Sequence, residues 1–251
     1  MVGYKYRSWK DPYHKDLLIN RELYFNSAND FNDLFDSNIE LNHEDVPEEE
    51  YLEHLKSVLL KKESEAFYDS LFEERVKSAF SNKKNHLSEH SKHITEEIKK
   101  VMGIYCLSLE NNSIHNWAYY GHGNKGYCLG IDYDNIFEKH ALNHVVVQYI
   151  KEYPNIRPNL QPDPIDILRI VSLKSIEFEK EKEIRLFKFK GVGHVIKFDP
   201  EDVKEIILGN KIDPQHEKEI YDIWKAVYPH ASLSRIKIKP KTFELIVVPY
   251  S

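Results

Sequence analysis

The feature that most constrains the fold is a change of sequence character over residues 47–100. Glu, Lys, His and Ser dominate this segment, Gly is absent, and apolar residues recur at helical spacing, as at Leu52, Leu55 and Leu59. This pattern predicts two or three amphipathic helices with solvent-exposed charged faces. Because β-rich sequence precedes and follows the segment, we expect a helical insertion on one side of a single core.

The rest of the chain contains runs that alternate apolar and polar residues, as strands do. In the first run, Tyr4 and Tyr6 would lie on one face, with Lys5 and Arg7 on the other. The predicted strands cover residues 3–7, 22–25, 103–109, 127–133, 145–149, 183–189, 206–208, 235–239 and 243–248.

Polar and proline-rich segments separate these strands. Asp-Pro pairs at 163–164, 199–200 and 213–214 predict helix starts, with Asp as the N-cap and Pro in the first helical position. Residues 26–36, rich in Asn and Asp, predict an ordered loop, and the prolines of 154–164 predict an extended segment. Because strands and helices do not alternate strictly, we expect an α+β fold with a mixed or antiparallel sheet. It would form a single domain over 1–251 that contains the 47–100 helical insertion.

Composition narrows the class of protein. The formal net charge of −6 gives no global attraction to nucleic acid, so such binding would need a local basic patch. No apolar run approaches the roughly 20 residues that span a bilayer, so we expect no membrane partner. The polar, aromatic N-terminus does not resemble a secretory signal, and Cys106 and Cys128 lie in apolar runs. We therefore expect a cytoplasmic protein with two buried, reduced thiols.

Three motifs fit ordinary structural explanations better than functional ones. The string at 121–126, GHGNKG, matches GxGxxG, but a predicted helix precedes it and a strand follows. A dinucleotide-binding loop has the opposite order, so we interpret the string as a turn whose amides and Lys125 could still contact an anion. His86, His90 and His93 share a helical face but lack a completing carboxylate or cysteine, which favours a solvated face over a zinc site.

The third motif is a possible cysteine triad. Cys106, His122 and Asp132 are the residue types of such a triad, but nothing in the sequence brings them together. Cys106 is expected to lie within a strand as a buried, unreactive thiol.

The most informative stretch is 177–185, EFEKEKEIR. Extended as one strand, it would place Glu179, Glu181, Glu183 and Arg185 on one face, where the carboxylates repel each other unless they bind cations or a polar ligand. An exposed edge strand would explain the pattern. The alternative is a Glu-x-Glu pair that lines a cleft, with Arg185 holding one of its carboxylates.

Aromatic residues before the glycine turn form a second candidate feature. Trp117 and Tyr120 are three residues apart in a predicted helix and could share a face. Core packing would explain this pair, and a stacking wall for a planar ring is the functional alternative.

Taken together, these segments resemble the DUF 2971 family, an uncharacterised bacterial family, across nearly the whole chain. The resemblance rests on YKYRS, LYFNSANDFNDLFD, CLSLENNSIHNWAYYGHGNKGYCLGID, VQYIKEYP, EKEIRL and EIILG in that order. The family's Trp-x-x-Tyr before a Lys-Gly turn, its Glu-x-Glu-x-Arg and its Phe-Asn-Asp all have counterparts here. They are Trp117, Tyr120, Lys125 and Gly126; Glu181, Glu183 and Arg185; and Phe31, Asn32 and Asp33. Residues 47–100 have no counterpart in the family pattern.

The layout also resembles that of ADP-ribosyltransferases, including DNA-directed toxins. The resemblance implies that Arg7 holds the phosphates of NAD, which is consumed as a substrate, and that Trp117 or Tyr120 flanks the nicotinamide. Glu183 would bond the ribose hydroxyl and stabilise an oxocarbenium-like centre, and Glu181 would position the acceptor. The catalytic candidates are thus Glu181 and Glu183. The cofactor-binding candidates are Tyr6, Arg7, Asn32, Trp117, Tyr120, Lys125 and Arg185.

Three functions follow as hypotheses. The first is an NAD-consuming ADP-ribosyltransferase-like enzyme, as a bacterial toxin or phage-defence effector with a macromolecular acceptor. The second is a metal-dependent nuclease or phosphodiesterase in which Glu181 and Glu183 join Asp33, Asp36 or Asp132 around Mg²⁺. The third is a non-catalytic binding module.

Overall fold

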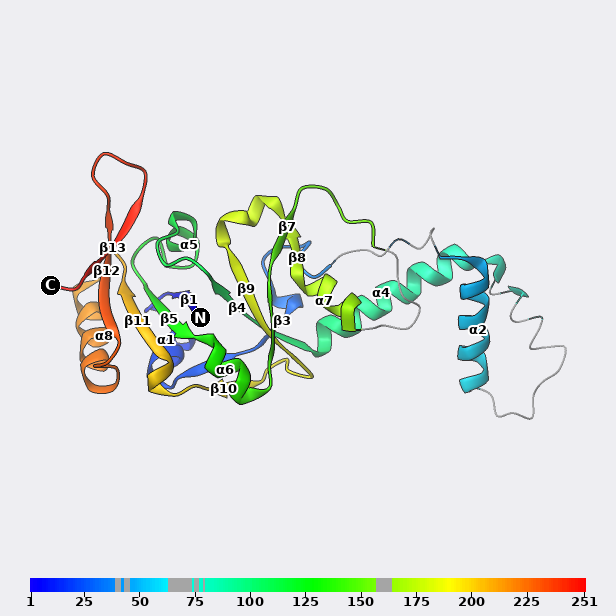
Figure 1. Ribbon diagram of the computed structural model, residues 1–251, viewed down its shortest axis with the longest axis horizontal. Coiled ribbons are helices and arrows are strands. Elements are labelled where there is room, and N and C mark those ends of the chain that lie inside the picture. The colour runs from blue at the N-terminus through cyan, green and yellow to red at the C-terminus, as the bar shows by residue number, and fades with distance from the viewer. Residues whose placement is uncertain (39–41, 43–45, 63–73, 75–76, 79, 157–163) are drawn as a thin grey trace.

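A large mixed sheet organises the protein in a computed structural model (Figure 1), which describes residues 1–38, 42, 46–62, 74, 77–78, 80–156 and 164–251. In this described part nine strands join one sheet in the order β13-β12-β11-β5-β1-β4-β9-β6, with the short β3 paired to β4. Their bounds are β1 Val2–Arg7, β3 Asn26–Ser27, β4 Met102–Ser108, β5 Tyr127–Asp132, β6 Asn143–Val146, β9 Glu183–Phe189, β11 Val203–Leu208, β12 Ser232–Ile238 and β13 Leu245–Pro249. Four further strands form two-stranded sheets, namely β2 Glu22–Tyr24 with β10 Val195–Lys197 and β7 Gln148–Ile150 with β8 Leu173–Ser175.

Most pairs in the large sheet are antiparallel, and β11 with β12 is parallel. A parallel pair needs a crossover, which α8 (Pro214–Val227) supplies. Asp213 caps this helix by accepting from the backbone N–H of Gln215, and Pro214 occupies the first turn. The predicted α+β class with a mixed sheet is confirmed.

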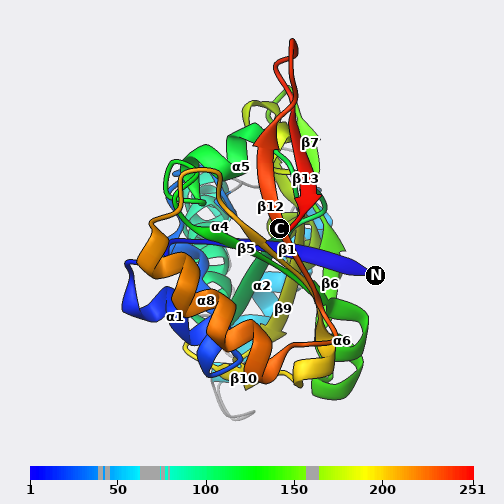
Figure 2. The ribbon, with the colours of Figure 1, turned by 90° about the vertical axis from the view of Figure 1, so that its left-hand side faces the viewer.

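Helices cover both faces of the sheet. On one face α1 (Pro12–Ile19) and α8 lie side by side (Figure 2), and the Tyr228 hydroxyl donates to the carbonyl of Leu18 at 2.6 Å. The main core lies beneath them and includes Leu129 and Ile206. On the other face α5 (Ile114–Tyr119) carries Trp117 onto a smaller core with Tyr6. A fourth helix, α6 (Tyr133–His140), follows β5 directly.

The helices predicted for 47–100 are present within the described residues as α2 (Glu48–Lys62) and α4 (Lys83–Val101). They extend away from the sheet, and α2 lies at the far end of α4 (Figure 1). They have a hydrophobic cluster of their own, formed by Val46, Tyr51, Leu55 and Leu87 with Phe80 packed against it. The predicted apolar positions between 63 and 73 and at 76 lie outside the described residues. Treatment of 47–100 as an insertion in a single domain stays a prediction.

Several predicted boundaries need correction. The strand expected at 145–149 is interrupted, because β6 pairs with β9 whereas β7 pairs with β8. The Asp-Pro pair at 199–200 starts a single turn of 3-10 helix, Pro200–Asp202, and leads directly into β11. The pair at 163–164 is followed by α7 (Pro164–Ser172) as predicted, whereas residues 157–163 of the expected extended segment lie outside the described residues.

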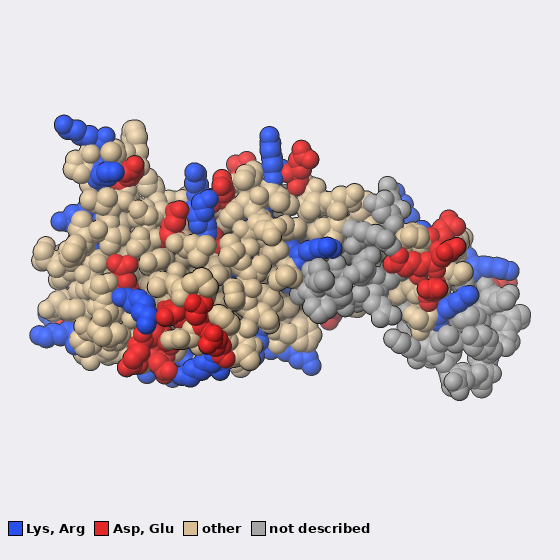
Figure 3. Space-filling model, in the orientation of Figure 1, with Lys and Arg blue, Asp and Glu red and all other residues tan. Residues whose placement is uncertain are grey.

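Two findings bear on the membrane and nucleic-acid partners considered in the sequence analysis. Among the described residues, no helix is both long and apolar enough to cross a lipid bilayer. On the face shown in Figure 3, basic side chains of the described residues are scattered among acidic ones rather than joined into a broad basic surface.

Residues 121–126 form the predicted turn, and its last glycine fixes how the turn meets the sheet. A Cβ at Gly126 would lie 2.0 Å from the carbonyl oxygen of Arg7, at the end of β1. Gly123 has a φ of +63° and nothing near its Cβ position. Gly126 is therefore required by close backbone approach, which explains the glycine-rich string without a dinucleotide.

We predict that Gly126→Ala destabilises the fold by about 1–3 kcal/mol, because the added methyl must displace the backbone at Arg7. Denaturant unfolding measures this change. Gly123→Asn is the matched control, since Asn tolerates a positive φ, and should change stability much less. Equal effects at the two positions would contradict the role given to Gly126.

Candidate active site

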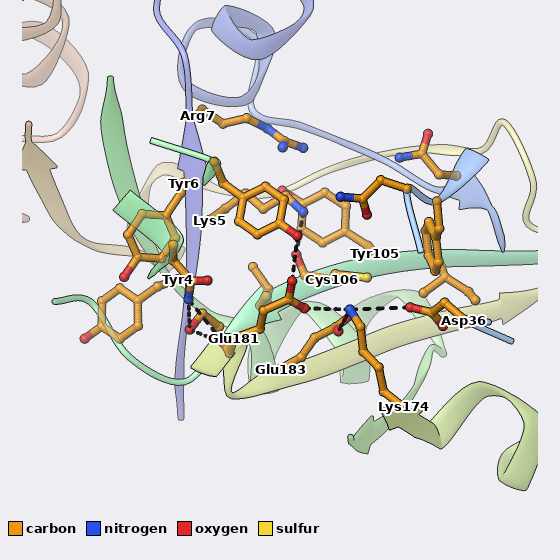
Figure 4. Close-up of a pocket in the computed structure, with 18 of the residues that line it drawn as sticks. Tyr4, Lys5, Tyr6, Arg7, Asp36, Tyr105, Cys106, Lys174, Glu181 and Glu183 are labelled. Carbon is orange, nitrogen blue, oxygen red and sulfur yellow. Dashed lines mark hydrogen bonds and ion pairs between the residues drawn. The ribbon is translucent and has the colours of Figure 1, made fainter. Parts of the chain in front are cut away.

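The candidate site lies where the sheet opens between β1 and β4. β1 pairs with β5 along its whole length, from Val2 to Arg7, but with β4 only at Tyr4 and Ser108. In Figure 4 the two strands cross rather than run alongside each other. The backbone of Lys5 to Arg7 therefore lacks a partner strand on the β4 side, and a cavity of about 250 Å³ occupies this opening.

Segments distant in the sequence line the cavity. They are β1, the loop that follows β3, β4, the end of α5, β8, the 3-10 helix η2 (Ile176–Glu181) and the start of β9. The lining residues are Tyr4, Lys5, Tyr6, Arg7, Asn26, Asp30, Phe31, Asn32, Asp36, Ile104, Tyr105, Cys106, Leu107, Ser108, Asn116, Tyr120, Lys174, Glu181 and Glu183.

A buried ion-pair cluster forms one wall of the cavity. Arg185 donates to both carboxylate oxygens of Asp36, at 2.8 and 2.6 Å, and from Nε to Glu183 at 2.9 Å. Lys174 donates to Glu181 at 2.6 Å and to Glu183 at 3.2 Å, and it lies 3.5 Å from Asp36. All five side chains are at most 7 % exposed. Two cations thus balance all but one of three carboxylates.

The cluster shifts the pKa values of Glu183 and Lys174 toward their charged forms. Burial alone raises the pKa of Glu183, but Arg185 and Lys174 outweigh it and lower that pKa to about 2. Burial likewise lowers the pKa of Lys174, but Glu183, Asp36 and Glu181 outweigh it and raise that pKa above its usual range. Glu183 is therefore an anion at any physiological pH, suited to stabilising positive charge rather than to taking up a proton.

The opposite wall carries two basic side chains that have no counter-ion among the described residues. Lys5 and Arg7 extend from the same face of β1 into the cavity, across from Glu181 and Glu183 (Figure 4). Among the described residues neither has a carboxylate within ion-pair distance. The Lys5 side-chain nitrogen donates to the Cys106 carbonyl at 2.6 Å, and the Arg7 guanidinium has no hydrogen-bond partner within the described part of the chain. Burial, followed by repulsion from Arg7, lowers the pKa of Lys5 to about 7.

Two buried polar atoms beside this cavity lack hydrogen-bond partners among the described residues. They are the hydroxyl of Tyr105 and Oδ1 of Asn116, on side chains that are 3 % and 2 % exposed. The Asn116 amide nitrogen donates to Ser108 Oγ and to the Glu181 carbonyl, which fixes the side chain. A buried polar group without a partner costs free energy, so both atoms are suited to binding a polar ligand or water.

Tyr120 connects α5 to the acidic wall. Ser113 caps the helix by accepting from the backbone N–H of Asn116, and this places Tyr120 at the C-terminal end over the cavity. The Tyr120 hydroxyl donates to Glu181 at 2.7 Å. Burial and then Glu181 raise the Tyr120 pKa, while a hydrogen bond with Asn32 opposes the shift. Tyr120 therefore stays protonated and acts as a hydrogen-bond donor.

Most of the residues predicted from the sequence do meet here. Arg7, Asn32, Tyr120, Glu181 and Glu183 line one cavity although they are widely separated in the sequence. Their catalytic and binding roles stay predictions.

Three predicted binding residues, Trp117, Lys125 and Arg185, do not line the cavity, whereas Tyr6 does. Trp117 is fully buried, packs edge-on against Tyr6 with ring centroids 5.2 Å apart, and donates to the Asn111 carbonyl. Core packing therefore explains Trp117, and Tyr6 directs its hydroxyl to the Glu110 carbonyl at 2.6 Å although it borders the cavity. Lys125 is exposed on the turn and does not line the cavity. Arg185 is fully buried behind Glu183, where it holds the carboxylate instead of contacting a ligand.

The single strand expected over 177–185 is also wrong. Residues Ile176–Glu181 form a 3-10 helix, and Lys182 ends it with a left-handed φ of 46°. Glu179 consequently lies outside the cluster and pairs with the exposed Lys182 at 3.1 Å. Glu181 and Glu183 still converge, because the turn between them brings both carboxylates to Lys174.

The other motifs are not sites within the described structure. Cys106, His122 and Asp132 have separate surroundings: Cys106 lies beside Glu183, His122 is on the exposed turn, and Asp132 contacts the N-terminal amine. His86 lies against Tyr51, its Nδ1 2.8 Å from the hydroxyl. No group of three or more His, Cys, Asp or Glu side chains is arranged to hold a metal among the described residues.

Several cavity residues were not predicted from the sequence, among them Lys174, Asp36, Lys5 and Tyr105. Lys174 gave a usable signal, since it is the one charge in the run IVSLKSI at 170–176. Asp36 appeared only as a possible metal ligand, and its pairing with Arg185 across 149 positions left no local signal. Lys5 and Tyr105 lie in ordinary strand patterns, and only the divergence of β1 from β4 makes them cavity residues.

Comparisons with protein-family models, with curated proteins and with solved structures yield no match for this chain.

We predict that the stability contributed by Glu183 declines as pH falls from about 4.5 to about 2. Its pKa is lower in the folded than in the unfolded chain, so the contribution is complete above pH 4.5 and is lost as the carboxylate is protonated. Denaturant unfolding of the wild type and Glu183→Gln at several pH values measures this contribution. The free energies of unfolding of the two proteins should converge as pH falls.

The matched control is Glu179→Gln, which removes an exposed carboxylate outside the cluster and should follow the wild-type curve. If the free energies of unfolding of wild type and Glu183→Gln differ by a constant amount over this pH range, the lowered pKa assigned to Glu183 is contradicted.

Proposed function

We propose that the cavity binds an NAD-type dinucleotide and that the protein is an ADP-ribosyltransferase-like enzyme, transferring the ADP-ribosyl group to an acceptor. The observation that carries this proposal is the pairing of two oppositely charged walls. Glu181 and Glu183 lie on one, and Lys5 and Arg7, which lack counter-ions among the described residues, lie on the other.

NAD has a complementary charge distribution, with a positive nicotinamide ring and a negative diphosphate. A guanidinium binds phosphate with strong, charge-assisted hydrogen bonds, which suits Arg7 to the diphosphate. The Glu183 carboxylate, whose pKa is lowered, favours the cationic ring and the positive centre that develops at the ribose when the ring leaves. The hydroxyl of Tyr105 and Oδ1 of Asn116 offer hydrogen bonds to ribose hydroxyls or to the carboxamide.

In this proposal the two glutamates have different roles. In the proposed reaction the bond between ribose C1′ and the nicotinamide nitrogen breaks, and its electron pair stays with the ring. Glu183, held charged by Arg185 and Lys174, stabilises the ribosyl centre. Glu181, held by Tyr120 and Lys174, positions the acceptor that bonds to C1′. The acceptor proton then passes to water.

The size of the cavity limits what it holds. About 250 Å³ lies just below the range of typical small-molecule sites, roughly 300–1,000 Å³, and suits the nicotinamide ribosyl half of the substrate. The adenosine half would extend past Arg7 to the surface. The proposal includes membership of the DUF 2971 family and a separate macromolecular acceptor in the cytoplasm, on which the protein acts as a toxin or phage-defence effector.

The metal-dependent nuclease is less well supported by the same geometry. Divalent ions prefer several free carboxylate oxygens. Here Asp36, Glu181 and Glu183 already bind Arg185 and Lys174, and Asp132 contacts the N-terminus instead.

We predict that Glu183→Gln lowers the rate of nicotinamide release from NAD about 100-fold or more, because it removes the charge that stabilises the ribosyl centre. The measurement is nicotinamide release by chromatography, with and without cell extract as a source of acceptor. Glu179→Gln is the matched control and should release nicotinamide at the wild-type rate.

Tyr120→Phe provides a second variant if Glu183→Gln does not fold, and it should lower the rate because Glu181 loses a hydrogen bond. Release that is absent from the wild type, or unchanged in both variants, would overturn the proposal. A rise in melting temperature with NAD but no release would instead favour a non-catalytic binding module.

A further inference from the structure

The cavity contains two lysines in opposite environments. Lys174 belongs to the acidic wall and Lys5 to the basic wall, and both line the same space (Figure 4). Since the reactivity of an amine depends on its charge, this contrast predicts different chemistry at the two side chains.

Lys174 is held as an ammonium ion. Its Nζ lies within 3.5 Å of Asp36, Glu181 and Glu183, and the ring of Phe178 lies 4.8 Å away. An ammonium group bound by three carboxylates has no lone pair available. Lys174 therefore serves as a structural cation and cannot act as a nucleophile.

Lys5 has the opposite surroundings. Its amine donates to one neutral acceptor, the Cys106 carbonyl, and lies 4.6 Å from the centre of the Tyr105 ring. The charged and titratable groups that act on it are Arg7 on its own strand, Cys106 on β4, and Glu181 and Glu183 across the cavity. Within the described part of the chain no carboxylate comes within ion-pair distance, whereas the Arg7 guanidinium extends from the same face of β1.

We propose that Lys5 is a reactive amine that forms a Schiff base with a small aldehyde or ketone whose anionic group pairs with Arg7. The two side chains are two residues apart on one strand face and project into one cavity. The ligand class is therefore a short carbonyl compound bearing a phosphate or carboxylate.

The chemistry needs only the two reactants. The Lys5 nitrogen attacks the carbonyl carbon, the carbonyl π electrons pass to oxygen, and proton transfer gives a carbinolamine. That oxygen then leaves as water, and a C=N bond replaces the C=O bond. A neutral amine can keep one N–H on the Cys106 carbonyl while its lone pair faces the cavity. A pKa of about 7 leaves a large share of Lys5 neutral at physiological pH.

This inference does not depend on the proposed ADP-ribosyl transfer. Imine formation needs Lys5 and Arg7 but neither Glu181 nor Glu183 as a catalyst. Nicotinamide release tests ADP-ribosyl transfer, and covalent trapping tests imine formation at Lys5. Either proposal can therefore fail without affecting the other.

The test uses two probes that differ by one phosphate, glyceraldehyde 3-phosphate and glyceraldehyde. Each is incubated with the full-length protein and cyanoborohydride, which reduces an imine to a stable amine, and peptide mass mapping locates the adduct. With the phosphorylated probe we expect one adduct, on Lys5, and none on Lys174. The labelling rate at Lys5 should rise with pH around a midpoint near 7, and at that pH it should exceed the rate at the exposed Lys10.

Variants separate the roles of the two side chains. Lys5→Arg should abolish the adduct, and Lys10→Arg, the exposed control, should leave it unchanged. Arg7→Gln also removes a positive charge near Lys5 and so changes the reactivity of Lys5 toward both probes. The informative quantity is therefore the labelling rate with glyceraldehyde 3-phosphate divided by the rate with glyceraldehyde. This ratio should fall about tenfold, the effect of losing one charge-assisted hydrogen bond of about 1.4 kcal/mol.

Three results would overturn the proposal. They are labelling of Lys5 no faster than of Lys10 in the wild type, an adduct that survives Lys5→Arg, and a probe ratio unchanged by Arg7→Gln. The wild-type mapping needs no variant, so the proposal remains testable if Lys5→Arg does not fold.

Discussion

The buried ion pairs around Arg185 are the constraint on which the rest of the site depends. An unpaired charge in a protein interior costs several kcal/mol, so a guanidinium with no exposed surface must be fully matched. Arg185 is matched by Asp36 from the loop after β3, by Glu183 on its own strand and by the carbonyl of Val171 in α7. One side chain therefore fixes a loop and a helix end against β9.

Lys174 extends this cluster to the surface of the cavity. It binds Glu183 and Glu181 together, and Glu181 in turn accepts from Tyr120 at the end of α5. Both oxygens of each glutamate are thus in use before any ligand arrives, and the negative wall is fixed in place. The facing wall arises from topology, because β1 leaves β4 after one residue pair and so exposes Lys5 and Arg7 to the opening. A rigid negative wall opposite cations without counter-ions among the described residues selects ligands that carry both charges.

The sequence predicted the elements of this site better than their geometry. Alternation of apolar and polar residues located β9 at 183–189 and placed Lys5 and Arg7 on one face of β1. This works because successive side chains of a strand point to opposite faces of the sheet. The same rule failed at 177–182, where a 3-10 helix lets Glu181 and Glu183 meet although Glu179 lies outside. Trp117 and Tyr120 were indistinguishable by spacing, and only tertiary packing places Trp117 in the core and Tyr120 at the cavity. The Asp36–Arg185 pair and the opening between β1 and β4 are long-range features, for which a single sequence contains no local signal.

The central claim is that Arg7, from the first strand, and the acidic wall near β9 surround one ligand that bears a diphosphate. Isothermal titration calorimetry with ADP-ribose, which retains the diphosphate and ribose but lacks the leaving ring, tests this most directly. The account predicts saturable one-to-one binding to the wild type, and at least tenfold weaker binding to Arg7→Gln. Absence of binding, or equal affinity of the two proteins, would contradict it.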